Sequence, residues 1–213
     1  MRIPIAADGW RFIIGFAVLG AFLLWLGRWW SMPWGVVAIL LTCFCAYFFR
    51  DFDRATPLND ALIYAPGDGR VLDVSKVDAG PYAGRPIVRI FLSVFDVHVQ
   101  RTPVGGKVSR VEYKKGTFLD ARHERAHLDN EQNLVTIDSP RGPIVVNQIA
   151  GLIARRILCW VKHGDAVQQG QRYGLIRFGS QVDVIFPTTG VSIEVKPGER
   201  VVSGVTVLAK WVS

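Results

Sequence analysis

The sequence predicts a mainly β fold, an antiparallel sandwich or barrel, that follows an apolar helical hairpin. Beyond residue 53, short apolar runs alternate with turn residues roughly every 8 to 12 positions, which is typical of all-β domains. Residues 161–170 and 195–204 share the pattern Val-Lys-x-Gly-acid-x-Val-x-x-Gly, which indicates an internal repeat. Near the N-terminus, the runs 12–26 and 34–49 are apolar and carry no charge.

The two N-terminal runs predict a membrane-associated helical hairpin over residues 1–54. Each run is shorter than the about 20 residues that a full span needs, so the hairpin either spans with its ends in the headgroups or lies as a shallow re-entrant loop. Aromatic rings, which membrane interfaces favour, crowd the ends of the runs: Trp10, Trp29, Trp30, Trp34, Tyr47 and Phe48. A cleaved signal peptide fits less well, because no small-x-small cleavage site follows the first run and the second run comes at once.

Charge predicts where the hairpin lies. Arg2 and Arg11 precede it and Arg50 and Arg54 follow it, whereas the connecting loop carries Arg28 alone. Because arginine is enriched on the cytoplasmic side of membranes, we expect both ends at the cytoplasmic face of the cell membrane. The net charge of +7, from 25 basic and 18 acidic side chains without a dense run, favours an anionic lipid surface over nucleic acid as the partner. The 3 cysteines show neither metal spacing nor an even disulfide framework, which favours a reducing compartment.

Residues 55–213 are expected to form the β domain. The repeat predicts strand, turn, strand and turn, with glycines where φ is positive, and it resembles the turns of biotinyl/lipoyl-type barrels. No lysine lies in a carrier-domain signature, so we do not expect a lipoyl or biotin carrier. Residues 146–159 are a helix candidate, since Ile149, Ile153 and Ile157 have helical spacing, although the same run fits a buried strand.

Gly179-Ser180 is the candidate reaction centre. The dipeptide lies within the strand-like residues 173–187, where a turn or bulge is the ordinary interpretation. If Ser180 is reactive, a base can deprotonate it and its hydroxyl can attack the carbonyl of Gly179, where no side chain obstructs the approach. A hydrolase nucleophile is the other option, but the Gly-x-Ser-x-Gly elbow is absent, since residues 178–182 read Phe-Gly-Ser-Gln-Val.

The other candidates are one aspartate and the four histidines. Asp68, in Pro-Gly-Asp-Gly, is by default a turn aspartate. His98 ends an apolar run, where a structural role is the more common one. His123 and His127 have i, i+4 spacing, but no further His or Cys lies nearby, so we expect no metal site. His163 lies in a turn of the repeat and is expected at the surface.

Several segments together resemble the phosphatidylserine decarboxylases, in particular their short, archaeal-type form. They are the hairpin, Gly179-Ser180, residues 65–71 (Ala-Pro-Gly-Asp-Gly-Arg-Val) and residues 91–103 (Phe-Leu-Ser-Val-Phe-Asp-Val-His-Val-Gln-Arg-Thr-Pro). The resemblance implies that the Gly179–Ser180 bond cuts itself and that Ser180 becomes a pyruvoyl group, a covalent cofactor. Chains 1–179 and 180–213 would then remain together as a heterodimer.

The resemblance also implies an enzyme of phospholipid biosynthesis, a carboxy-lyase. The pyruvoyl ketone forms a Schiff base with the amine of phosphatidylserine and acts as an electron sink while carbon dioxide leaves, which yields phosphatidylethanolamine. In this comparison His98 matches a functional histidine of the family, and Asp68 matches an aspartate of its self-processing apparatus. No external cofactor or metal is implied.

Arg101 marks a departure from the family pattern. Many members carry a second histidine at this position, and an arginine cannot act as a neutral base at ordinary pH. Either His98 therefore serves both self-cleavage and decarboxylation, or Asp68 activates Ser180 directly or through water. Arg101 is instead suited to bind the phosphate or carboxylate of the substrate.

Two alternatives to this function stay open from the sequence. One is a non-enzymatic, membrane-anchored β-barrel adaptor, which would remain uncut. The other is a pyruvoyl decarboxylase that acts on another amino-acid headgroup or a soluble amino acid. The sequence leaves the oligomeric state open, a homo-oligomer included.

Overall fold

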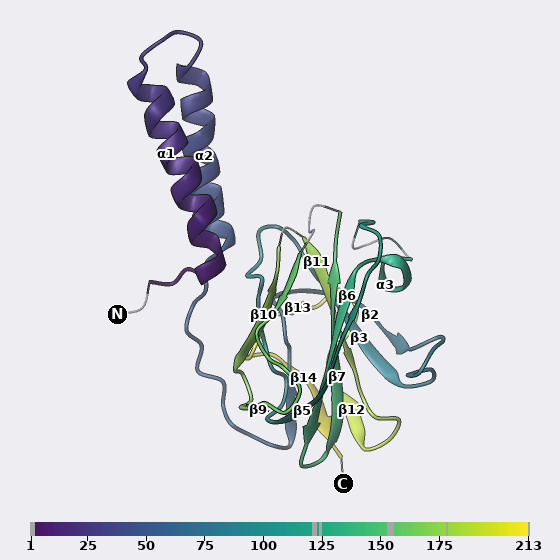
Figure 1. Ribbon diagram of the computed structural model, residues 1–213. Coiled ribbons are helices and arrows are strands. Elements are labelled where there is room, and N and C mark those ends of the chain that lie inside the picture. Colours follow the sequence, from purple (N-terminus) through teal and green to yellow (C-terminus); the bar gives the residue numbers. More distant parts are fainter. Residues whose placement is uncertain (1–2, 121–122, 124, 153–155, 178, 213) are drawn as a thin grey trace. The chain divides into compact units, whose positions relative to one another are not determined.

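The computed structural model describes the chain except residues 1–2, 121–122, 124, 153–155, 178 and 213 (Figure 1). The chain folds into two compact units, Met1–Asp53 and Arg54–Ser213. The first contains a short 3-10 helix, Ala7–Gly9, and the helices α1 (Trp10–Trp25) and α2 (Met32–Phe48). The second contains the β strands and the short helix α3 (Ala126–Asp129).

The first unit is a helical hairpin, as the apolar runs predict. Gly20 and Gly35 lie where α1 and α2 pack, and a Cβ on either would come within 2.8 Å of a side chain of the other helix. Small residues at such positions let apolar helices approach closely. Residues Ala7–Trp25 form a helical segment long and apolar enough to cross a membrane, by length and composition alone, whereas α2 is shorter. Trp25 and Trp29, near the turn, are 80% and 87% exposed.

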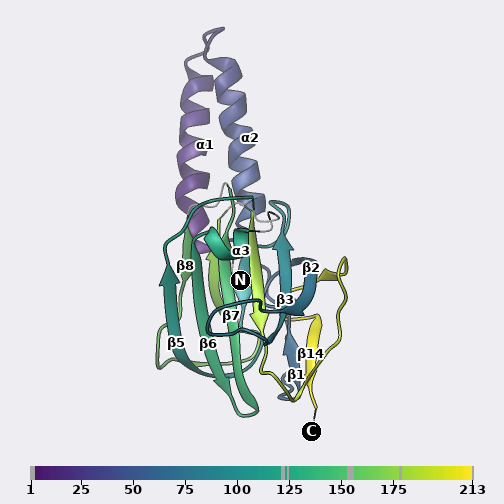
Figure 2. The same cartoon turned by 90° about the vertical axis from the view of Figure 1, so that its right-hand side faces the viewer.

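The second unit is built from antiparallel sheets, which confirms the predicted fold class. The large sheet has eight strands in the order β13-β2-β3-β11-β7-β6-β5-β9, and two three-stranded sheets have the orders β1-β14-β12 and β4-β10-β8. Figure 2 shows β5, β6 and β7 side by side in the large sheet. The strands are β1 (Leu62–Tyr64), β2 (Gly69–Lys76), β3 (Pro86–Leu92), β4 (Val99–Arg101), β5 (Gly106–Lys114), β6 (Gln132–Ser139), β7 (Gly142–Ala150), β8 (Ile157–Cys159), β9 (Ala166–Val167), β10 (Arg172–Ile176), β11 (Ser180–Ile185), β12 (Val191–Ile193), β13 (Arg200–Val201) and β14 (Val207–Trp211).

The sheet orders show that the unit is two similar halves. Reading the large sheet from its two ends gives β13-β2-β3-β11 and β9-β5-β6-β7, and the halves meet where β11 pairs with β7. The two small sheets match in the same way, since β1-β14-β12 corresponds to β4-β10-β8. One half is therefore β4 to β10, a continuous segment. The other half consists of β1 to β3 together with β11 to β14.

The turns of the predicted repeat occupy equivalent places in the two halves. Gly164 N donates to Val108 O at 2.8 Å, and Gly198 N donates to Val71 O at 2.8 Å. These two glycines have φ values of 94° and 87°, which glycine adopts readily. The internal repeat is thus a structural repeat, as the sequence pattern indicates.

The predicted helix over residues 146–159 is wrong where the structure describes it. Strand β7 runs through Ala150 and strand β8 begins at Ile157, whereas Ile153 lies outside the described residues. From Ile144 to Ala150, β7 is buried at every position, because it is a central strand that is covered on both faces. Such continuous burial hides the two-residue period, so that a strand and a helix look alike in sequence.

The two faces of β11 differ in chemistry. Val182 and Val184 lie in the main hydrophobic core, whereas Gln181 and Asp183 lie on the other face, as strand geometry requires. Asp183 is 2% exposed and accepts a hydrogen bond from Gln181 Nε2 at 2.6 Å. Burial raises the pKa of Asp183 from 3.8 to about 7, against the opposing effects of Gln181 and the Arg89 charge.

This raised pKa predicts that Asp183 makes the fold less stable as the pH rises. Between the ordinary carboxyl pKa of 3.8 and about 7, the folded state holds a proton that the unfolded state releases, so the free energy of unfolding falls as pH increases. We expect the Asp183→Asn variant to lack this fall. Urea unfolding of the full chain in detergent, at several pH values, should show the variant gaining on the wild type between pH 4 and 7. A difference that stays constant with pH would contradict the assignment.

Candidate active site at the crossing between the halves

The candidate site lies where the chain passes from one half to the other. The chain crosses twice, through residues 93–98 between β3 and β4 and through residues 177–179 between β10 and β11. His98 ends the first crossing and Gly179 ends the second. Because both crossings lie outside the repeated strands, the repeat does not dictate their sequence.

Ser180 is the first residue of β11 and is fixed from both sides. It pairs with Leu92 of β3 and with Ala150 of β7. The residue is 0% exposed, and its Oγ has no hydrogen-bond partner among the described residues. The preceding Gly179 has a φ of 77°, a conformation that residues with side chains rarely adopt. The structure therefore presents a buried hydroxyl directly after a sharp change in backbone direction.

His98 contacts the peptide that precedes Ser180. The imidazole is 0% exposed, and its Nε2 accepts a hydrogen bond from Gly179 N at 3.3 Å. Its Nδ1 lies 3.0 Å from the carbonyl oxygen of Asp96. Since Nε2 accepts, the proton of a neutral imidazole lies on Nδ1 and is donated to that carbonyl. This tautomer leaves a basic nitrogen facing the Gly179–Ser180 segment.

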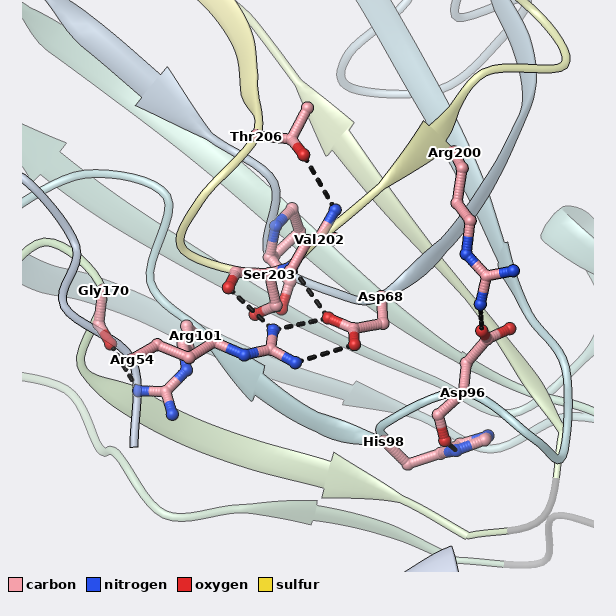
Figure 3. A network of polar contacts seen from close by, with 11 residues as sticks. Arg54, Asp68, Asp96, His98, Arg101, Gly170, Arg200, Val202, Ser203 and Thr206 are labelled. Atoms are coloured by element: carbon pink, nitrogen blue, oxygen red, sulfur yellow. Dashed lines mark hydrogen bonds and ion pairs between the residues drawn. The ribbon is translucent and has the colours of Figure 1, made fainter. Parts of the chain in front are cut away.

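The loop that carries His98 is held by the side chain of Asp96. One carboxylate oxygen accepts from the backbone N and the Oγ of Ser93, at 2.9 and 2.8 Å. The other accepts from Arg200 Nη2 at 2.8 Å, and Figure 3 shows this ion pair beside the His98 ring. Arg200 belongs to β13, so a residue from the C-terminal segment positions the histidine loop.

Asp68 lies in a separate set of contacts. Its two oxygens face Arg54, with Nη–Oδ distances of 2.5 and 2.7 Å, and Oδ1 also accepts from Ser203 N at 2.8 Å (Figure 3). Arg54 Nη1 further donates to Ser203 O at 2.8 Å, and Ser203 Oγ donates to Pro66 O at 2.8 Å. Among the residues that the structure describes, no hydrogen bond joins Asp68 to His98 or Ser180. The arrangement ties the 66–69 turn to the C-terminal segment.

Arg101 does not extend towards Gly179. The side chain is 4% exposed and its Nη1 donates to Gly170 O at 3.0 Å. Figure 3 shows it at the opposite side of the network from His98. With Arg54 and Arg172 it lines an open cavity of about 500 Å³.

No metal centre is found in the described part of the chain, where no group of three or more His, Cys, Asp or Glu side chains could hold an ion. His123 and His127 do not share a helical face, because α3 begins only at Ala126. His163 is exposed, with Nδ1 2.8 Å from Ser109 O, as expected for a residue in a surface turn.

Four residues of this site were missed from the sequence. Arg54, Asp96, Arg200 and Ser203 all position the candidate residues, yet none was singled out. The repeat itself held a signal for two of them. Arg200 and Ser203 stand where the first copy has Ala166 and Gln169, so the second copy departs from the first at these polar positions.

The site also suits a pyruvoyl group, which forms from a serine. A buried hydroxyl without a partner in the described residues, after a glycine at positive φ, leaves the Ser180 side chain unoccupied by structural hydrogen bonds. The family model for phosphatidylserine decarboxylase matches residues 41–209, which is most of the chain. Members of this family are membrane-associated. The chain therefore belongs to the phosphatidylserine decarboxylase family, and it is a carboxy-lyase that converts phosphatidylserine to phosphatidylethanolamine by means of a pyruvoyl group derived from a serine.

Proposed function

We propose that this chain is a short, archaeal-type phosphatidylserine decarboxylase that cuts itself between Gly179 and Ser180. The observation that carries the proposal is the hydrogen bond from Gly179 N to His98 Nε2, next to the unpartnered and buried Oγ of Ser180. The cut divides the β domain, residues 55–213, and leaves chains 1–179 and 180–213. The family match favours this enzyme over a membrane-anchored adaptor.

Self-cleavage begins with proton transfer from Ser180 Oγ to His98. The lone pair on Nε2 accepts from Gly179 N, so the imidazole has to exchange this donor for the hydroxyl of the next residue. As Oγ attacks the Gly179 carbonyl carbon, a C–O bond forms and the C–N bond to Ser180 breaks. The resulting ester loses the Ser180 α-proton and expels the Gly179 carboxylate. Water then replaces nitrogen at residue 180 and ammonia departs.

His98 is suited to both proton-transfer steps. Its Nδ1–H keeps donating to the Asp96 carbonyl oxygen, which leaves Nε2 as the basic atom and supports the imidazolium that follows. The pyruvoyl group at residue 180 supplies a ketone that acts as an electron sink for the loss of carbon dioxide. His98, which is buried beside it, is placed to return a proton to the substrate carbon. We therefore propose one histidine for both steps, where many relatives have two.

Asp68 has a positioning role in this proposal. Both oxygens of Asp68 face the Arg54 guanidinium, and Oδ1 also accepts from Ser203 N. These contacts with Arg54 and Ser203 hold the turn before β2 against the C-terminal segment. The anion-binding role of Arg101 stays a prediction, and it would be exerted from the arginine-lined cavity.

The two chains are expected to remain together as a heterodimer after the cut. Strand β11 is hydrogen-bonded between β3 and β7, and β14 lies between β1 and β12, so the short chain supplies central strands. The Asp96–Arg200 pair and the Asp68–Ser203 hydrogen bond also join the two prospective chains. We place the enzyme at the cytoplasmic face of the cell membrane, which follows from the arginines outside the hairpin.

The wild type should separate into two chains on denaturation, and Ser180→Ala should not. Without the hydroxyl no ester forms, so the variant is expected to remain one inactive chain near 23.7 kDa. Intact mass spectrometry and decarboxylation of phosphatidylserine are the measurements. Ser192→Ala is the matched control. It removes a hydroxyl of the same C-terminal segment that donates to Glu194 at the surface, and this variant should be cut like the wild type. Activity in the Ser180→Ala variant would sink the mechanism.

His98→Ala should block self-cleavage while the protein stays folded. General-base catalysis contributes about 100- to 10,000-fold, so we expect the rate of chain cleavage to fall within that range. The rate is followed by gel electrophoresis from the time of synthesis. His163→Ala, which removes an exposed imidazole from a repeat turn, should cut normally. Normal cutting by the His98 variant would transfer the role of base to another residue.

The Arg54→Ala variant distinguishes a positioning role of Asp68 from a role as the base. If Asp68 holds the turn through Arg54 and Ser203, then Arg54→Ala and Asp68→Asn should both slow cleavage, by about 10- to 100-fold, since small misplacements are costly for catalysis. If Asp68 is instead the base, Asp68→Asn should slow cleavage by about 100- to 10,000-fold, far more than Arg54→Ala. The cleavage rates are compared with those of Lys210→Ala, which breaks the exposed Lys210–Glu194 ion pair.

A further inference from the structure

The connections around Ser180 leave the large sheet at one end of its central strands. Strand β3 ends at Leu92, strand β7 ends at Ala150, and both residues pair with Ser180 at the start of β11. Because neighbouring strands are about 4.8 Å apart, the connections after Leu92 and Ala150 leave the sheet on either side of Ser180, about 10 Å from each other. A surface that contacts this end of the strands therefore also contacts the candidate site.

Each of these two connections carries a large, exposed apolar side chain. Phe95 is 63% exposed and lies three residues after Leu92, and Leu152 is 61% exposed and lies two residues after Ala150. Phe95 belongs to a tight turn in which Asp96 N donates to Ser93 O at 2.9 Å. Its backbone is thus fixed, and the ring is presented to the outside without a large entropic loss on binding.

Each of these two connections is also associated with an exposed arginine. Arg200, whose side chain is 73% exposed, contacts the Phe95 turn through Asp96. Arg156 is exposed in the connection of Leu152, and its carbonyl accepts from Arg177 N at 3.3 Å, two residues before Gly179. Asp96 balances the charge of Arg200, so the positive charge that accompanies the apolar side chains beyond this pair is that of Arg156. That combination favours an anionic lipid surface.

We propose that Phe95 and Leu152, with Arg200 and Arg156, form a docking rim. This rim binds the interface of an anionic bilayer at the end of the strands where Ser180 lies. The proposal rests on the proposed function, because it assumes that the chemistry occurs at Ser180. The carboxylate of the lipid substrate lies in the headgroup layer, whereas Ser180 and His98 are both 0% exposed. Apolar anchors on both sides of Ser180 bring the buried site to the depth of the headgroups, so that the substrate need not leave the membrane.

The test compares a bilayer substrate with a soluble one. Full chains with Phe95→Asp, Leu152→Asp or both are assayed on vesicles that contain long-chain phosphatidylserine, and on dihexanoyl phosphatidylserine below its micellar concentration. The helical hairpin is unchanged in every variant, so general anchoring is held constant. We expect the ratio of vesicle to soluble activity to fall at least about 10-fold in the double variant, because charged groups are poorly accommodated in the interface. Val212→Asp is the matched control. Val212 is 51% exposed and lines a hollow with Gly142, at the other end of β7. Its ratio of vesicle to soluble activity should match that of the wild type.

The outcomes separate this proposal from the proposed function. A wild type that is neither cut nor active on either substrate overturns the proposed function itself. A wild type that is active, with an unchanged ratio in the double variant, overturns the docking rim alone. A double variant that changes its oligomeric mass in detergent, but not its ratio, would show that the rim is an interface between copies of the chain and also overturns lipid docking.

Discussion

The antiparallel pairing of β7 with β11 is the constraint on which the rest of the structure depends. These strands pair from Ser180 with Ala150 to Ile185 with Val145, and through them the two halves join at the centre of the large sheet. One half is a continuous segment inserted into the other, so the chain has to cross between the halves twice. Both crossings lie at the same end of the central strands. The repeated strands build the scaffold, and the two unrepeated crossings are free to carry His98 and Gly179.

The sheet also fixes the position of Ser180, the proposed reactive serine. Its backbone is paired on both sides, so the position of its Oγ is set by strands rather than by a mobile loop. A buried hydroxyl without a hydrogen bond costs about 1–3 kcal/mol, and none is made within the described residues. Such a deficit has no benefit for folding and is typical of functional sites, where local rules are broken. The left-handed Gly179 before it is a second local departure.

Much of the fold could be predicted because its signals are local. The hairpin follows from two uncharged runs, and the repeat from glycines at fixed spacing, which occupy equivalent turns in the structure. Gly179 and, through the family resemblance, His98 could be named as candidate site residues, although only the structure brings His98 Nε2 to Gly179 N. The positioning residues could not be found in this way. Arg54 and Ser203 are 149 residues apart in sequence, and Asp96 and Arg200 are 104 apart, so no local pattern connects them. Strand β7 was taken for a helix candidate because burial on both faces removes the alternation that identifies a strand.

These distant pairs gain a further meaning from the position of the cut. Residues 180–213 provide β11 at the centre of the large sheet, and they also provide Arg200 for the histidine loop and Ser203 for the Asp68 turn. In the proposed cut, the short chain is thus part of the scaffold as well as the source of the pyruvoyl group. Because the Arg200 side chain is 73% exposed, solvent screens its pair with the buried Asp96, and the pair is better explained by the orientation of the His98 loop than by the strength of the fold. The proposed cut falls at a crossing between the halves, so it would remove one connection and the amide of residue 180, while the remaining pairs of β11 with β3 and β7 hold the reactive group in place.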